Sequence, residues 1–168
     1  MLSMGLHWMM LLLLIGVFTC ILLIDSFPEN SSTETLLRTS HFTLGLTVFA
    51  LVWVRLLVKL LSRAPVIEPP IPRWQDRMSK VVQALLYGLM FCMPVLGWLS
   101  LSAAGKAIPF FGWQLPALIA QNKNLEEIIK NVHEAGAATL FALVGIHAAA
   151  ALHHHYFLRD NTLRRMLP

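Results

Sequence analysis

Charged residues are scarce in this sequence. They make up 13% of its 168 residues, whereas a soluble domain usually contains about 25%. The 57% share of hydrophobic residues and the mean hydropathy of +0.64 exclude an intrinsically disordered chain and argue against a water-soluble enzyme. The composition is that of an integral membrane protein.

Other signatures are missing too. The chain has only two cysteines, Cys20 and Cys92, which excludes a disulfide-stapled secreted domain; both fall in apolar stretches, where we expect them to act as small hydrophobic residues. There is no glycine-rich phosphate loop, no nucleophile elbow and no CxxC pair, so nucleotide-dependent and hydrolytic chemistry is not indicated. The basic pI of 9.4 reflects charges beside the apolar stretches and does not indicate nucleic-acid binding.

Long apolar stretches are what the sequence has in abundance. Four are long enough to cross the roughly 30 Å hydrocarbon core of a bilayer as helices, at about residues 6–24, 39–61, 81–101 and 126–157. We find no internal repeat, and residues 65–72 are predicted to form an extended linker. The sequence therefore predicts one all-α transmembrane domain over residues 1–168, a four-helix bundle in which Pro94 bends the third span.

The charges between the spans predict the orientation of the bundle. One side holds residue 1, the linker after the second span and the C-terminal tail. It carries nine basic residues (Arg55, Lys59, Arg63, Arg73, Arg77, Lys80, Arg159, Arg164 and Arg165) against three acids (Glu68, Asp76 and Asp160). The other side carries four basic residues (Arg38, Lys106, Lys123 and Lys130) against six acids (Asp25, Glu29, Glu34, Glu126, Glu127 and Glu134). The positive-inside rule then predicts that both termini are cytoplasmic.

Four of the seven histidines fall into pairs by depth. His7 opens the first span at the inner side, and His41 lies near the outer end of the second. In the fourth span His133 lies near the outer end and His147 follows 14 residues later. That separation is about 21 Å along a helix and returns the side chain to within about 40° of the same face. The sequence therefore predicts an outer pair, His41 with His133, and an inner pair, His7 with His147.

Two imidazoles that face each other across a helix bundle are the ligand set of a six-coordinate b-type haem. A flat macrocycle also needs small residues beside its ligands. Such residues follow three of the four histidines at helical spacing: Gly45, Gly136, Ala150 and Ala151. This pattern favours haem over a bare metal ion. A lone histidine is more simply explained as a polar residue bonded between helices, but the pairing of four argues against that alternative.

The run His153-His154-His155 needs a separate explanation. Successive helical residues point about 100° apart, so these three side chains cannot close on one ion. Only His154, seven residues after His147, shares the ligand face, about 10 Å further inward. There it could bond a quinone carbonyl or pass a proton. Alternatively, all three histidines are residues of the headgroup zone.

Seven short stretches resemble the bacterial cytochrome b561 family, which consists of small four-helix inner-membrane cytochromes. They are His7-Trp8, Ser40-His41 leading to Gly45, Arg55-Leu56-Leu57, residues 131–134, 147–152 and 154–157, and the tail 160–166. The likeness covers essentially the whole chain, and the four paired histidines fall on the family's haem-ligand positions. One departure is the start, because members generally carry more residues, basic ones included, than the six that precede His7 here.

The resemblance implies two haem b groups and electron transfer from a donor to quinone. In the best-understood members superoxide is oxidised on the periplasmic side and ubiquinone is reduced, in the bacterial inner membrane. Basic residues of the outer side could steer an anion there, and His154 would stand near the quinone. Haem propionates need cationic partners, for which Arg38 and Arg55 are the candidates; snorkelling to the interface is the alternative for Arg55.

Two other functions remain open. The chain could be a non-catalytic cytochrome b subunit that passes electrons from a partner dehydrogenase or hydrogenase to quinone, with its outer loop, residues 102–124, as the docking surface. It could also be a haem-free membrane bundle or a metal-ion permease, although the lack of an internal repeat is unusual for a transporter. A non-catalytic subunit would not react with superoxide by itself, whereas a superoxide oxidase would. A haem-free bundle or permease would lack the haem absorbance at about 560 nm.

Overall fold

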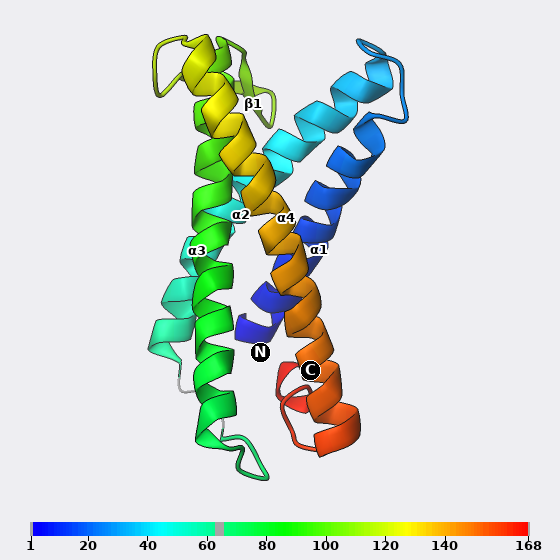
Figure 1. Ribbon diagram of the computed structural model, residues 1–168, viewed down its shortest axis with the longest axis vertical. Coiled ribbons are helices and arrows are strands. Elements are labelled where there is room, and N and C mark those ends of the chain that lie inside the picture. Colours follow the sequence, from blue (N-terminus) through cyan, green and yellow to red (C-terminus); the bar gives the residue numbers. More distant parts are fainter. Residues whose placement is uncertain (1, 63–65, 168) are drawn as a thin grey trace.

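Four long helices make up most of the molecule (Figure 1). The computed structural model describes residues 2–62 and 66–167, so Met1, Arg63 and Pro65, which entered the charge and linker predictions, lie outside the described residues. The helices are α1 (Leu2–Ile24), α2 (Ser32–Leu61), α3 (Arg73–Ala104) and α4 (Lys123–His153). A π-helical turn, η1 (His154–Leu158), extends α4, and a 3-10 turn, η2 (Arg164–Met166), lies in the tail.

Each long helix has the length and composition to cross a membrane. α1 packs along α2 and α3 along α4, and α2 also contacts α3. Figure 1 shows both ends of the chain toward the lower end of the bundle, where the indole Nε1 of Trp8 donates a hydrogen bond of 2.7 Å to the carbonyl oxygen of Met166. The predicted four-helix architecture is confirmed. That the end with both termini is cytoplasmic stays a prediction.

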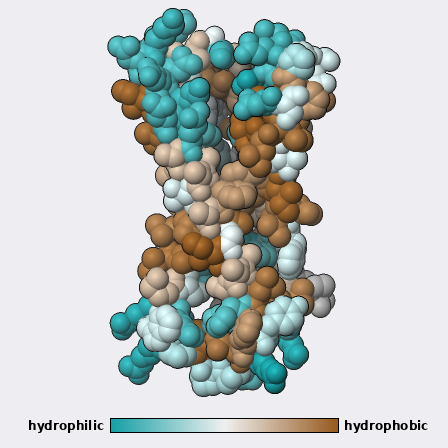
Figure 2. All heavy atoms as spheres, turned by 45° about the vertical axis from the view of Figure 1, so that its right-hand side comes forward, coloured by the Kyte–Doolittle hydropathy of each residue, from teal (hydrophilic) through white to brown (hydrophobic). Residues whose placement is uncertain are grey.

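The surface of the molecule is apolar in the middle and polar at the ends, as expected for a protein that spans a bilayer. On the face drawn in Figure 2, hydrophobic side chains gather over the middle of the molecule and hydrophilic ones lie at both ends. Large apolar residues such as Leu12, Leu22 and Phe141 are more than half exposed, at 68%, 69% and 59%. Exposed apolar side chains would promote aggregation in water, but they are favourable where a helix faces the hydrocarbon of a bilayer. Cys20 and Cys92 are free thiols.

The helices begin earlier than the apolar stretches. α2 starts at Ser32 and α3 at Arg73. The Oγ atom of Ser31 caps α2 by accepting a 3.2 Å hydrogen bond from the backbone N–H of Glu34, whose carboxylate accepts a 2.9 Å bond from the N–H of Asn30. This arrangement resembles a capping box and stabilises polar first turns that a hydropathy pattern does not detect. α3 continues through Pro94 without ending.

A β-hairpin lies at the end of the bundle away from the N and C labels (Figure 1). Strands β1 (Ile108–Phe110) and β2 (Trp113–Leu115) are antiparallel, with Ile108 opposite Leu115. Phe111 and Gly112 between them have positive φ values of 47° and 82°. Glycine adopts a positive φ without steric strain because it has no Cβ atom. Ile108 is buried against Leu46 of α2. Only a loop was expected here, because strands of three residues are too short for a periodic pattern.

Candidate functional site

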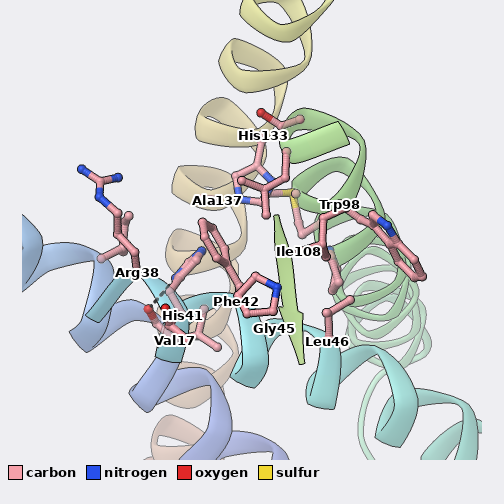
Figure 3. Close-up of a pocket in the computed structure, with 18 of the residues that line it drawn as sticks. Val17, Arg38, His41, Phe42, Gly45, Leu46, Trp98, Ile108, His133 and Ala137 are labelled. Atoms are coloured by element: carbon pink, nitrogen blue, oxygen red, sulfur yellow. Dashed lines mark hydrogen bonds between the residues drawn. The ribbon is translucent and has the colours of Figure 1, made fainter. Parts of the chain in front are cut away.

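The outer histidine pair lies between α2 and α4. The ring centroids of His41 and His133 are 6.4 Å apart at an interplanar angle of 73°, and both rings face the same pocket (Figure 3). The Nδ1 atom of His41 lies 3.0 Å from the carbonyl oxygen of Val17 on α1. Because a carbonyl only accepts, Nδ1 carries the hydrogen and Nε2 keeps its lone pair. This is the tautomer that a metal-ligating histidine needs.

The inner pair lies between α1 and α4. The ring centroids of His7 and His147 are 6.3 Å apart at 72°. Nη2 of Arg55 donates to Nδ1 of His7 over 2.9 Å, because a guanidinium has no acceptor. Nη1 of the same residue is buried and has no hydrogen-bond partner among the described residues. A cation with a donor still available for an acidic group therefore stands beside the inner pair.

Both pairs have the spacing that a shared iron requires. A metal–nitrogen bond of about 2 Å, with the ring nitrogen roughly 1 Å from its centroid, puts two imidazoles on one ion at about 6 Å between centroids. The observed values are 6.3 and 6.4 Å. In residues 2–62 and 66–167, no group of three or more His, Cys, Asp or Glu side chains could hold a metal ion. A metal held in a macrocycle, which needs only two ligands from the protein, would fit sites of this kind.

The outer pair opens into a cavity of about 920 Å³, within the roughly 300–1,000 Å³ typical of ligand and cofactor sites. Its walls come from all four helices and β1, and most are apolar: Leu14, Val17, Phe18, Phe42, Leu46, Met90, Met93, Trp98, Ile108, Ala137 and Leu140. Gly45 of α2 also lines the cavity, and a Cβ atom there would meet nothing within 4 Å. This glycine therefore leaves open space beside His41, as predicted.

Two other glycines have different roles. Gly97 of α3 is not among the small residues that the sequence predicts beside the histidines, yet a Cβ there would lie 3.3 Å from Cε1 of His133. It lets the backbone of α3 approach the imidazole. Gly136 was expected to give clearance to the macrocycle, but a Cβ there would lie 2.5 Å from Sδ of Met93. Gly136 thus makes room for a side chain of α3.

Basic and acidic residues mix at the mouth of the cavity. Arg38 has a half-exposed side chain paired with Glu34 on the same helix, and Figure 3 shows its guanidinium directed away from the two histidines. Lys130 pairs with Glu134 at 3.7 Å. Lys106 also lines the cavity and has no acidic partner within 4 Å in the described part of the chain. Lys106 is therefore the cation most available to an incoming anion.

His154 differs from its two neighbours. Its side chain is 18% exposed, and Nδ1 lies 2.5 Å from Oδ2 of Asp160. His153 is exposed and stacks on Phe157 with centroids 5.2 Å apart. The sequence singled out His154 but not its acidic partner, because nothing in a helical pattern predicts that residue 160 turns back toward residue 154. A role for His154 in catalysis stays a prediction.

Known proteins resemble this chain over its whole length. A family model described as prokaryotic cytochrome b561 matches residues 1–168. Cytochrome b561 homolog 1 of Escherichia coli (strain K12) is 36% identical over 163 residues, which cover 97% of this chain and 93% of the relative. The probable superoxide oxidase CybB of Yersinia pestis is 32% identical over 167 residues, which cover 99% and 94%. Cytochrome b561 homolog 2 of Escherichia coli (strain K12) is 27% identical over 169 residues, which cover 98% and 88%.

Proposed function

Since the chain belongs to the prokaryotic cytochrome b561 family of membrane electron-transfer proteins, which bind b-type haem, we propose that it holds two haems, one on each histidine pair. The observation that carries this proposal is the matching geometry of the two pairs, at 6.3 and 6.4 Å between ring centroids. The chain is a multi-pass bacterial membrane protein. We infer from its loop charges that it lies in the inner membrane with both termini cytoplasmic.

The residues around each pair would orient the histidine ligands and bind the haem propionates. A bound haem supplies one-electron chemistry. The carbonyl of Val17 fixes the ligating tautomer of His41. At the inner pair, the guanidinium of Arg55 would bind a propionate in place of Nδ1 of His7. That imidazole could then carry its hydrogen on Nδ1 and ligate through Nε2. Arg38, which forms an ion pair with Glu34, is the propionate partner proposed for the outer haem.

We further propose that electrons enter from superoxide at the outer haem and leave to ubiquinone at the inner end near His154. Two superoxide anions give two molecules of oxygen and two electrons, and one ubiquinone takes up these electrons with two protons. The name of the Yersinia pestis relative supports this donor, as does the cation Lys106, which lines the outer cavity. A titratable imidazole at the inner end supports quinone reduction.

A reduced-minus-oxidised spectrum with a pyridine-haemochrome count tests the haem proposal. Two b haems per chain are expected. Complete absence of haem from protein supplied with it would support the haem-free bundle or permease. Stopped-flow mixing of the oxidised chain with superoxide then tests the donor, and haem reduction at about 560 nm is expected without any partner. If only a partner dehydrogenase or hydrogenase reduces the haems, the chain is a non-catalytic subunit.

Reversal of the charge of Lys106 is expected to slow electron entry. This cation lines the outer cavity and has no acidic partner within 4 Å in residues 2–62 and 66–167. Lys106→Glu should therefore reduce the rate of haem reduction by superoxide several-fold at low ionic strength, and added salt should shrink the difference. The measurement is stopped-flow absorbance at matched haem content. Lys123→Glu is the control, because Lys123 opens α4 at the same end but does not line the cavity. Equal slowing in both variants would exclude a local effect.

A further inference from the structure

An acid is buried next to His154. Asp160 is only 4% exposed, although it lies in the tail beyond α4. Its Oδ2 atom lies 2.5 Å from Nδ1 of His154, and its Oδ1 atom accepts a 2.8 Å hydrogen bond from the N–H of Thr162. Burial raises the pKa of Asp160, but the hydrogen bonds from His154 and Thr162 outweigh it and hold the pKa below its usual value. The buried group is therefore a carboxylate.

The chain reverses sharply to bring this carboxylate under the imidazole. The π-helical turn η1 ends α4, and Arg159 follows in the left-handed region with φ 55°. The N–H of Asp160 then donates to the carbonyl oxygen of His154 over 3.2 Å. π-helical turns inside or at the end of α-helices are often associated with functional sites.

The segment that precedes α3 holds the reversal in place. The N–H of Asn161 donates to the carbonyl oxygen of Glu68, and its side-chain Oδ1 accepts from the N–H of Glu68, both at 3.0 Å. Asp160 is therefore fixed from two sides, by the end of α4 and by the linker after α2.

We propose that Asp160 is a positioning residue that holds His154 in one orientation and one tautomer for proton delivery to a quinone. The inference rests on the proposed quinone reduction. Because Nδ1 donates its hydrogen to the carboxylate, the nitrogen that exchanges protons is Nε2. For each electron that reaches the quinone, an N–H bond at Nε2 of the imidazolium breaks and an O–H bond forms on a quinone oxygen. The imidazole, partly exposed at 18%, then takes a proton from water.

The same bonds also suit a purely structural role, in which Asp160 only anchors the tail. The variants are chosen to separate the two roles. Asp160→Asn keeps the size of the side chain and removes its charge, whereas Asp160→Glu keeps the charge. Asp76→Asn is the matched control, because Asp76 is an acid at the same end of the molecule whose salt bridge, to Lys80 at 2.7 Å, lies away from His154. Haem content is measured first in each variant.

The experiment follows electron exit alone. Protein reduced with dithionite, freed of excess reductant, is mixed with ubiquinone-1, and haem reoxidation is recorded in H₂O and D₂O. We expect Asp160→Asn to lower the limiting rate at saturating quinone by at least about tenfold, as for loss of an oriented proton donor, with a larger solvent isotope effect and little change in the half-saturating quinone concentration. Asp160→Glu should recover part of the rate, and Asp76→Asn should match the unsubstituted protein.

Three outcomes decide the matter. If Asp160→Asn reoxidises at the rate of the unsubstituted protein, the inference is wrong and the proposed function stands. A change confined to the half-saturating concentration, with an unaltered isotope effect, would assign Asp160 a structural role and also overturn it. If ubiquinone-1 does not reoxidise even the unsubstituted protein, the proposed quinone reduction fails and the inference fails with it.

Discussion

Replacement of His133 by alanine is expected to leave about one haem per chain instead of two. The haem proposed for each pair would depend on both imidazoles, because each would supply one of its two protein ligands. His41→Ala should have the same effect on the outer haem, and His7→Ala or His147→Ala on the inner one. The pyridine-haemochrome count and the reduced spectrum measure the loss. His153→Ala is the control, since His153 is exposed and its ring stacks on Phe157.

Double variants test which histidines share a haem. If His41 pairs with His133 across α2 and α4, as their 6.4 Å separation indicates, the double variant of these two residues should keep one haem. The combination of His41→Ala with His147→Ala damages both pairs and should leave none. The reverse pattern would mean that the pairing is wrong, even if all four histidines are ligands.

Obstruction of the outer cavity is expected to have a comparably large effect. Gly45 lines this cavity, and open space surrounds the position where its Cβ would lie. The aromatic ring in Gly45→Phe should fill space beside His41 and remove the outer haem, while the inner haem stays. Gly45→Ala should keep both haems, because the methyl group meets nothing within 4 Å, and it favours the helix by up to about 1 kcal/mol.

A lipid-facing glycine provides the control for this substitution. Gly88 on α3 is exposed, has open space around its Cβ position and does not line the outer cavity. Gly88→Phe should therefore retain both haems. Haem stoichiometry is measured together with circular dichroism, which reports whether the helices form. Retention of both haems in Gly45→Phe would show that the cavity is not the haem site.

The sequence alone determined the number of spans and predicted the depth of the histidines. A bilayer imposes both, because only long apolar helices satisfy their backbone within hydrocarbon and because a helix advances by a fixed 1.5 Å per residue. Residue spacing therefore converts directly into depth. The placement of His133 and His147 on one face of α4 follows from the same periodicity, and the structure brings each of them beside its predicted partner.

The contacts that set each histidine's environment were decided only by the tertiary structure. The carbonyl of Val17, the close approach of Gly97 and the buried carboxylate of Asp160 all come from segments that meet through packing. Local periodicity gives the face of a helix but does not say which backbone atom of another helix lies opposite it. Arg38 shows the converse, since its pairing with Glu34 one turn away is a local contact that competes with the propionate contact expected of it. Thus the predicted depth of each histidine followed from the sequence. The tautomer of His41, the space beside the imidazoles and the partners of the charged groups depended on how the helices and the tail pack together.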